Sequence, residues 1–449
     1  MPGHETCLQA KTVPELKTGP NDRHARPFPQ VATMPAHDPD TPRPFWPPRV
    51  EYVALGLILL GFIVLSSTGV AALPLKDFVE YWSAGDVFLA DGNPYDPEAL
   101  SASLSNALGE ERSSTTMMWN PPWTLPLTAP FAMLPIRLAH VLWVGVQLIL
   151  VLVSANMLWR AYGGTAEPGS WFRAAVLLFP PTVFLIVYGQ IGALCLFGVA
   201  GFLYFMDRDQ PIFAGLCVAL TAIKPHLLFA FGLYLLLEAL VSRRDRIALL
   251  SGAIAIAVTA AGAWRINPHV YSDYFAALTA PPGATGFVSV QDWRLPLGSY
   301  WLRMQFAPEH FWVQFLPAAV VTLGTFVYWR RAPGQRDWLR VTPVLVITSL
   351  LAAPYGGWMF DLVLLLIPVI HVVSGLSPQA GRLALLGLTV VNVAVLVGMP
   401  YIGVLALEQY VWFAPAFAVA YLVADLWLRR AGAERFVPQA QPPLLRAHA

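Results

Sequence analysis

The sequence predicts an all-α protein that crosses a membrane about twelve times. Of its 449 residues, 56% are hydrophobic and only 12% are charged, whereas a soluble domain has about 25% charged residues. The apolar residues gather in runs long enough for membrane helices, and most basic residues gather in the loops on one side of these runs. These three observations predict a polytopic membrane protein.

The apolar runs define the predicted spans. A helix needs roughly 20 apolar residues to cross a bilayer, and shorter or broken helices are tolerated where they line a cavity. We expect spans near residues 52–71, 138–159, 173–188, 192–206, 211–223, 226–242, 247–264, 313–329, 341–353, 360–374, 383–400 and 410–428.

Lys and Arg predict the orientation. With the N-terminus in the cytoplasm, 21 of the 28 Lys and Arg face the inside, as the positive-inside rule requires. An even number of spans then returns the C-terminus to the cytoplasm. Two large outside loops, at about 72–137 and 265–312, are rich in Trp, Tyr and Pro, which suits helices lying at the membrane surface.

The domain organisation follows from composition. Residues 1–49 contain eleven Pro and few apolar runs, so we expect a disordered cytoplasmic tail. Residues 50–430 form the predicted transmembrane domain, and residues 431–449 form a second disordered tail. The net charge of +1 gives no basic field for nucleic acid.

Several kinds of chemistry lack a sequence signature. The three cysteines, Cys7, Cys195 and Cys217, have neither metal-ligand nor disulfide spacing. No P-loop, nucleotide fingerprint or carboxylate cluster with metal spacing is present. We therefore expect no metal and no cofactor, and a phosphate substrate would have to arrive on a lipid.

Two carboxylates follow the first predicted span on its outer side. Asp77 and Glu80 are three residues apart, so they share one face if this stretch is helical. Carboxylates this close raise one another's pKa and can prepare a general base. The alternative is a solvated loop carboxylate that pairs with Lys76.

Two outer turns carry further polar groups. Gln190 lies in the turn Tyr188-Gly189-Gln190-Ile191-Gly192, and Lys224 precedes Pro225 and His226 after a short span. A cation beside a His suits a phosphate, and Pro225 would break the helix there. The alternatives are a simple helical hairpin turn and a Lys that extends to the membrane interface.

A fourth group follows a Pro-Gly break, where Tyr355 and then Asp361 precede a helix. An Asp that opens a helix is also explained by the helix dipole. Arg265 and Arg294 add outside cations, and we include them among the candidate substrate-binding residues.

Four blocks in this order resemble glycosyltransferase family 87, membrane enzymes of the GT-C superfamily that include polyprenol-phosphate-mannose-dependent mannosyltransferases. The blocks are Asp77-Phe78-Val79-Glu80-Tyr81-Trp82 with Gly92-Asn93-Pro94-Tyr95-Asp96; Asn120-Pro121-Pro122-Trp123 with Pro130, Leu134-Pro135 and Ala139 through Trp143; Gly189-Gln190 through Ala214-Gly215-Leu216 to Ile223-Lys224-Pro225; and Pro354-Tyr355 with Phe360-Asp361-Leu362.

The resemblance implies a GT-C fold and an inverting transfer of a mannose-like hexose. The donor would be a polyprenyl-phosphate sugar, the acceptor a glycan or glycolipid, and the place the outer face of a bacterial inner membrane. Asp77 takes the position of the family's general base, with Glu80 as the rival. Tyr81 and Tyr95 become candidate substrate-binding residues. The mannosyltransferase branch also uses a His near the fourth block, where this chain has Trp358 and Asp361.

Two other classes share this pattern of spans and loops. A polyprenol-linked flippase or polymerase is expected to need several Lys or Arg within its spans, and here Lys224 alone qualifies. A secondary transporter is expected to have repeated halves with paired broken helices, and no such repeat is evident.

Overall fold

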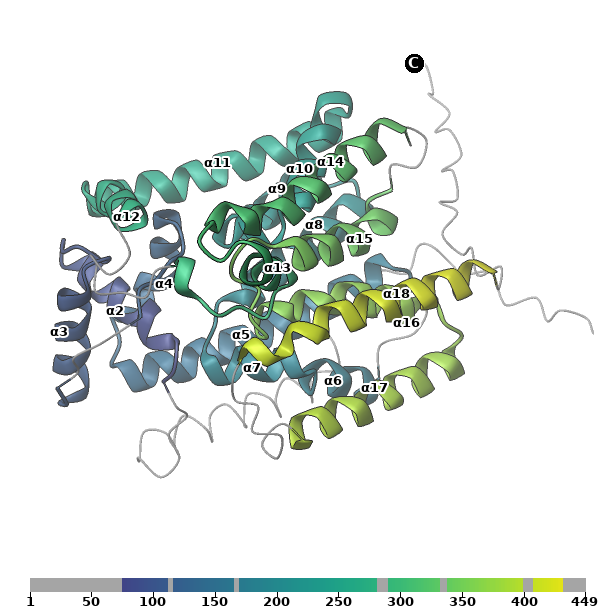
Figure 1. The fold of residues 1–449 in the computed structure, drawn as a ribbon, viewed down its shortest axis with the longest axis horizontal. Coiled ribbons are helices and arrows are strands. Elements are labelled where there is room, and N and C mark those ends of the chain that lie inside the picture. The colour runs from purple at the N-terminus through teal and green to yellow at the C-terminus, as the bar shows by residue number, and fades with distance from the viewer. Residues whose placement is uncertain are drawn as a thin grey trace, which may run out of the picture. The chain divides into compact units, whose positions relative to one another are not determined.

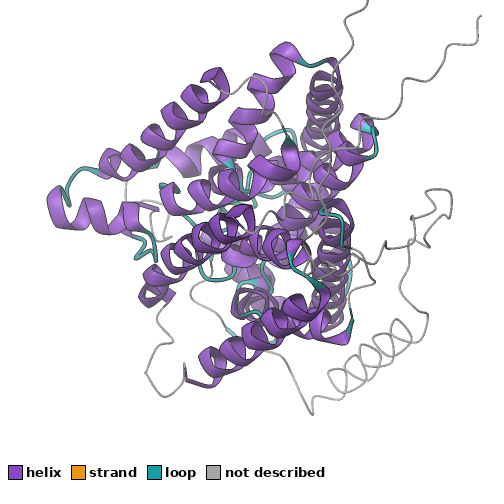
Figure 2. Cartoon of the chain, turned by 90° about the vertical axis from the view of Figure 1, so that its right-hand side faces the viewer, coloured by secondary structure: helices purple, strands orange, loops and turns teal. Residues whose placement is uncertain are grey.

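The computed structural model describes residues 75–111, 116–164, 169–280, 290–331, 337–398 and 407–430. All of them belong to the unit Arg49–Ala449. Every regular element in these ranges is an α-helix or a short 3-10 helix, without a strand (Figures 1 and 2). The predicted all-α class is therefore confirmed for the described part of the chain. The predicted tails 1–49 and 431–449 and the first span 52–71 lie outside it.

The first outer segment is folded into helices. It contains α2 (Phe78–Leu89), α3 (Pro97–Leu108), the 3-10 turn η1 (Pro122–Thr124) and α4 (Leu125–Ala132). Helix α2 packs closely on α4 at Gly85, where an added Cβ would lie 3.0 Å from Ala129 Cα. The Ser103 hydroxyl donates to the Asp86 carboxylate at 2.7 Å and joins α3 to α2. This segment carries Asp77 and Glu80 on a packed helix.

Each predicted span beyond 52–71 coincides with a helix or with a pair of consecutive helices. The helices are α5 (Ile136–Ala161), α6 (Ser170–Leu177), α7 (Pro180–Tyr188), α8 (Gly192–Asp207), α9 (Pro211–Val218) with η2 (Ala219–Ile223), η3 (Pro225–Leu227) with α10 (Phe229–Val241), α11 (Arg243–Ile266), η5 (Phe311–Phe315) with α14 (Leu316–Arg331), α15 (Trp338–Ala352), η6 (Asp361–Leu365) with α16 (Leu366–Gly375), α17 (Pro378–Gly398), and η7 (Leu407–Trp412) with α18 (Phe413–Arg430).

Length and apolarity divide these helices into two groups. Five helices of the described residues are long and apolar enough to cross a membrane, and six if α6 and α7 are one bent span. The other apolar helices are shorter, and the count of twelve crossings stays a prediction. The predicted span 173–188 is broken by a bend of 54° before Pro180, because Phe179 is extended ahead of a Pro-Pro pair.

The second segment that is predicted to lie outside makes hydrogen bonds with loops between the helices. It contains α12 (Val270–Thr279), η4 (Val290–Asp292) and α13 (Gly298–Phe306). Ser299 Oγ donates to the Ala353 carbonyl at 2.6 Å, and Gln314 Nε2 donates to the Pro354 carbonyl at 2.6 Å. Asn267 Nδ2 also donates to the Gly92 carbonyl at 2.8 Å. The two outer segments therefore hold the loops at this end of the bundle.

At the opposite end, the helices carry most of the arginines. Trp338 Nε1 donates to the Asp245 carboxylate at 2.7 Å and joins the start of α15 to the start of α11. Asp245 N in turn is capped by the Ser242 hydroxyl at 3.2 Å. The basic residues of this end, among them Arg243, Arg331 and Arg340, predict that it faces the cytoplasm.

Cysteine labelling tests this orientation. Asn106 is exposed on α3 and Gln379 is exposed in the first turn of α17. In a Cys7→Ser background, Asn106→Cys should react with a membrane-impermeant maleimide in intact cells, because the first outer segment is predicted outside. Gln379→Cys should react only after permeabilisation. The reverse pattern would overturn the predicted topology.

Candidate active site

One face of helix α2 presents three polar side chains. Asp77 precedes the helix as its N-cap residue, and Glu80 and Tyr81 follow at spacings of three and four residues, so all three lie on one side of it. Lys76 adopts φ +33°, a conformation that is sparsely populated by residues other than Gly. This local strain turns the chain directly ahead of Asp77.

The turn after α7 is fixed by the backbone conformation of Gly189 and by contacts with Phe78 and Trp143. Gly189 adopts φ +69° and ends the helix, and its added Cβ would lie 2.8 Å from Phe78 Cβ. Trp143 Nε1 donates to the Gly189 carbonyl at 2.7 Å. Only Gly combines this backbone conformation with so close an approach to Phe78. The following residue, Gln190, is thereby held directly against α2.

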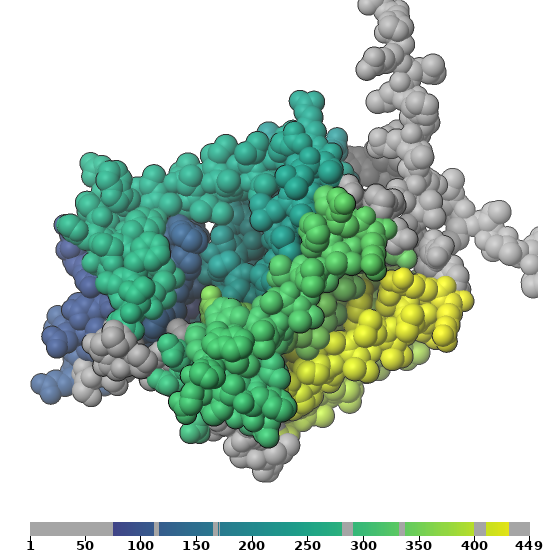
Figure 3. All heavy atoms as spheres, turned by 45° about the horizontal axis from the view of Figure 1, so that its top comes forward, coloured from purple at the N-terminus to yellow at the C-terminus, as the bar shows by residue number. Residues whose placement is uncertain are grey.

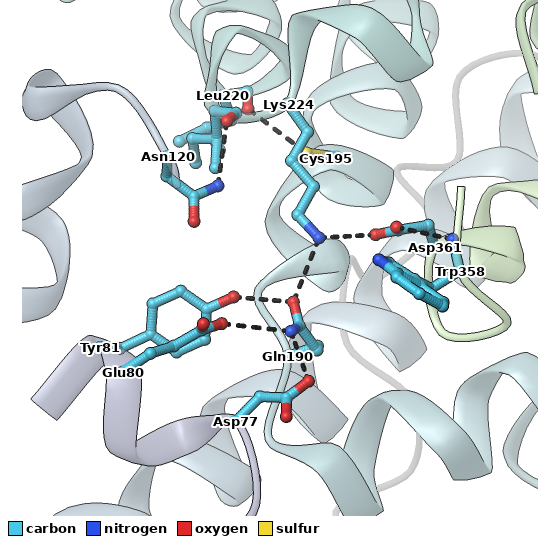
Figure 4. A network of polar contacts seen from close by, with 11 residues as sticks. Asp77, Glu80, Tyr81, Asn120, Gln190, Cys195, Leu220, Lys224, Trp358 and Asp361 are labelled. Carbon is cyan, nitrogen blue, oxygen red and sulfur yellow. Dashed lines mark hydrogen bonds and ion pairs between the residues drawn. The ribbon is translucent and has the colours of Figure 1, made fainter. Parts of the chain in front are cut away.

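The Gln190 side chain is the centre of a buried hydrogen-bond network (Figure 4). Its Nε2 donates to Asp77 Oδ2 at 2.8 Å and to Glu80 Oε1 at 3.2 Å. Its Oε1 accepts from the Tyr81 hydroxyl at 2.7 Å and from Lys224 Nζ at 3.1 Å. A primary amide has two N–H donors and two acceptor lone pairs, so these four contacts use its whole capacity.

Lys224 occupies the break between two short helices. The residue before a proline is forced out of the α conformation, and Lys224 adopts φ −133° and ψ 68° between η2 and η3. The residue is only 9% exposed. It meets the network from the side opposite α2 (Figure 4).

The carbonyl groups freed by this break are bound by other elements. Asn120 Nδ2 donates to the Ile223 carbonyl at 3.1 Å, and Trp123 Nε1 donates to the Ala222 carbonyl at 3.2 Å. The Cys195 thiol lies 3.7 Å from the Leu220 carbonyl. The second block of the resemblance therefore caps the helix end that carries Lys224, because unpaired backbone groups are costly in an apolar interior.

Asp361 neutralises Lys224. Lys224 Nζ lies 2.7 Å from Asp361 Oδ1, and Asp361 is 1% exposed. The second carboxylate oxygen of Asp361 accepts from the Trp358 backbone N–H at 3.1 Å. This buried ion pair fixes the ammonium group and leaves one of its three N–H donors outside these two contacts, within the described residues.

Burial raises the pKa values of the two carboxyl groups at the start of α2, those of Asp77 and Glu80. Burial raises the pKa of Asp77 above its ordinary value, against the lowering effects of the Gln190 hydrogen bond and of the charges on Lys224 and Lys76. Burial, and then the negative charge of Asp77, raises the pKa of Glu80 well above its ordinary value. Asp77 is half-buried and Glu80 only 6% exposed. When the pair holds one proton, we therefore expect it on Glu80.

A histidine lies beside this network. The rings of His226 and Tyr355 are 4.4 Å apart. His226 Nε2 also occupies the space that a Cβ on Gly356 would need. The fourth block contains no His in its own sequence, yet the fold brings His226 to it from η3.

The structure gathers most, though not all, of the predicted site residues. Six of them meet in the network, namely Asp77, Glu80, Tyr81, Gln190, Lys224 and Asp361, while His226, two residues after Lys224, packs on Tyr355. Tyr95 packs instead on Tyr274, with ring centroids 5.2 Å apart. Arg265 and Arg294 are exposed. These three show no contact with the network among the described residues, so their predicted roles lack structural support.

The sequence analysis placed Trp143 in the second block without a role; its ring stacks on Tyr81 at 5.5 Å, and its Nε1 donates to the Gly189 carbonyl. The capping role of Asn120 and Trp123 was not predicted either. No group of three or more metal-ligating side chains occurs in the described ranges. What the site does offer is a half-buried carboxylate and a fixed cation on opposite sides of one amide.

The comparisons with known proteins identify the family. The model of glycosyltransferase family 87 matches residues 118–354, which is more than half of the chain. This range contains Gln190 and Lys224, while Asp77, Glu80 and Asp361 lie outside it. No curated relative and no solved structure matches the chain. The extent of the match shows that this chain belongs to glycosyltransferase family 87 and is a membrane glycosyltransferase.

Proposed function

We propose that this glycosyltransferase moves a hexose of the mannose type from a polyprenyl-phosphate donor to a glycan or glycolipid acceptor. The observation that carries the proposal is the placement of Asp77 and Lys224 on opposite sides of the Gln190 amide. A base and a cation separated in this way suit a displacement in which a proton leaves the acceptor and negative charge builds on a leaving phosphate.

Asp77 is the proposed general base. As the acceptor oxygen attacks the anomeric carbon, its proton passes to Asp77. The bond from that carbon to the phosphate oxygen breaks, and its electron pair leaves with the polyprenyl phosphate. One such displacement inverts the anomeric configuration. Asp77 suits this role better than Glu80, because it is more exposed and its pKa is less strongly raised.

Lys224 is the proposed phosphate ligand, with His226 beside it. Its ammonium group has one N–H donor beyond Asp361 and Gln190, and a charge-assisted hydrogen bond to phosphate is among the strong ones. A low-dielectric site increases the attraction between a cation and a developing anion. This chemistry needs no nucleotide and no metal in the proposed scheme.

A lipid-anchored donor fits the apolar surface of the protein. The space-filling view is hollowed between α11 and α14, with atoms from the middle of the chain on the floor of the hollow (Figure 3). Helix α11 is largely exposed, and it is apolar between its charged ends, as a helix in contact with lipid would be. We place the reaction at the outer face of a bacterial inner membrane, because the positive-inside rule puts the arginine-rich end in the cytoplasm.

Separate substitutions of Asp77 and Glu80 distinguish the proposed base from its rival. Asp77→Asn should lower the turnover number by about 10²–10⁴-fold, the usual worth of a general base. Glu80→Gln should lower it far less, because its amide still accepts a hydrogen bond from Gln190. The measurement is transfer of label from radiolabelled polyprenyl-phosphate mannose to a membrane glycan fraction by the purified, reconstituted protein.

The opposite ranking would move the base to Glu80. Full activity in both variants would reject a carboxylate base on α2. Melting temperatures of both variants close to that of the unaltered protein are the control, since both substitutions keep the volume of the side chain.

The Lys224–Asp361 pair requires a matched double substitution. Lys224→Ala should destabilise the protein by about 3–5 kcal/mol, because it leaves a buried carboxylate without a cation. The double variant Lys224→Met/Asp361→Asn should recover much of this loss, since neutral replacements of similar volume are tolerated. Despite its recovered stability, the double variant should bind farnesyl phosphate, a short analogue of the lipid phosphate, more weakly than the unaltered protein does.

Thermal unfolding and calorimetric titration with farnesyl phosphate measure these two effects. If the stable double variant binds farnesyl phosphate as tightly as the unaltered protein, Lys224 is not the phosphate ligand.

A further inference from the structure

The Gln190 amide leaves no hydrogen-bonding capacity for a substrate. Its two N–H donors are taken by Asp77 and Glu80, and its two lone pairs by Tyr81 and Lys224. The side chain is 6% exposed. A residue in this condition can act on a reaction through its neighbours, whereas the substrate contact predicted from the sequence would require one of these four bonds to break.

We infer that Gln190 is a positioning residue, which fixes the carboxylate of Asp77 relative to the ammonium group of Lys224. This inference rests on the proposed function, in which Asp77 is the base and Lys224 the phosphate ligand. Gln190 itself then contacts neither donor nor acceptor. Its contribution is to keep the distance between the Asp77 carboxylate and the Lys224 ammonium group constant.

The orientation of the amide is determined by its partners. Lys224 has donors only, and an ionised carboxylate has acceptors only. A flipped amide would aim its NH2 group at the Lys224 ammonium and its oxygen at Asp77, which is repulsive on both sides. The charges therefore select one orientation, and the polarised amide links them: the cation draws electron density toward Oε1 and makes the N–H groups better donors.

The backbone under Gln190 is equally constrained. Gly189 is confined by Phe78 and held by Trp143, and the Gln190 backbone N–H donates to the Leu185 carbonyl at 3.0 Å. The backbone of Gln190 is therefore fixed to the end of α7, and its amide is fixed to α2 and Lys224. Such rigidity matters because a misplacement of about 1 Å at a reacting group costs roughly 10²-fold in rate.

The hydrogen bond from Gln190 also affects the protonation of Asp77. The charged groups that face Asp77 are Lys76 and Glu80 from its own segment, Lys224 from the third block and Asp361 from the fourth. Tyr188 lies on the α7 side, with its ring 5.8 Å from Lys76 Nζ. The bond from Gln190 lowers the pKa of Asp77. Its loss should therefore raise that pKa further and move the start of activity to higher pH.

Two substitutions at Gln190 test the inference. Gln190→Met keeps the volume and removes all four hydrogen bonds. Gln190→Asn keeps the amide and shortens the arm by one methylene, so we expect its NH2 group to fall short of Asp77. If Gln190→Met fails to fold, Gln190→Asn carries the test, because it leaves fewer buried groups unpaired. Tyr81→Phe is the matched control, since it removes a bond to the amide oxygen and leaves the bridge to Asp77.

The first measurement needs no substrate. Infrared titration of the reconstituted protein follows the stretching band of protonated carboxyl groups, and the component lost in Asp77→Asn is assigned to Asp77. In Gln190→Met and Gln190→Asn this component should titrate at higher pH than in the unaltered protein, whereas in Tyr81→Phe it should stay in place. An unchanged titration of Asp77 in both Gln190 variants would overturn the inference.

The second measurement separates positioning from donor binding. The turnover number with radiolabelled polyprenyl-phosphate mannose should fall roughly 10²-fold in Gln190→Met, while the Kd of farnesyl phosphate stays unchanged because Asp361 still holds Lys224. A raised Kd with an unchanged turnover number would make Gln190 a donor ligand and reject the inference.

Failure of the proposed function has a different signature. In that case the unaltered protein transfers no label, or Asp77→Asn remains active, whatever happens at Gln190. If Asp77→Asn is inactive while both Gln190 variants transfer label normally, the proposed function stands and the positioning role alone is rejected.

Discussion

A cation buried among apolar helices must be neutralised, and this requirement organises the site. Lys224 is 9% exposed and lies between Asp361 and Gln190. An isolated ammonium group in such surroundings would cost several kcal/mol or more. Its partners lie 137 and 34 residues away in the chain. Satisfying one charge therefore brings together helix ends that local sequence preferences alone would leave apart.

The helices that carry these groups all break where the groups meet. Pro225 interrupts one helix, Gly189 ends another and a Pro-Gly segment precedes Asp361. Each break frees backbone groups that water cannot reach. Side chains from other segments bind them, as Trp123 does at Ala222 and Gln314 at Pro354. Broken backbone and polar side chains thus stabilise one another, and the site gains rigidity from the satisfied helix ends.

The sequence predicted the helices well, because an apolar run of sufficient length is a local property. It also pointed to Lys224 and Asp361, because charges at helix ends are costly and stand out. It could not predict that these two pair, since pairing depends on how distant helices pack. Residue type and sidedness alone suggested Arg265 and Arg294, and the resemblance suggested Tyr95; the fold leaves all three away from the network. The structural role of Trp143 could not be predicted from the sequence, because this role is a tertiary hydrogen bond to the Gly189 carbonyl.

His226 shows how position along a chain differs from position in a site. The mannosyltransferases that the sequence resembles use a His near the fourth block, and this chain has none there. The fold brings His226 there from η3, directly after Lys224, and Gly356 leaves it room by lacking a Cβ. The imidazole lies over Tyr355, close to the segment that delivers Asp361. Position along the chain therefore does not decide which part of the fold a residue joins, because packing brings distant segments together.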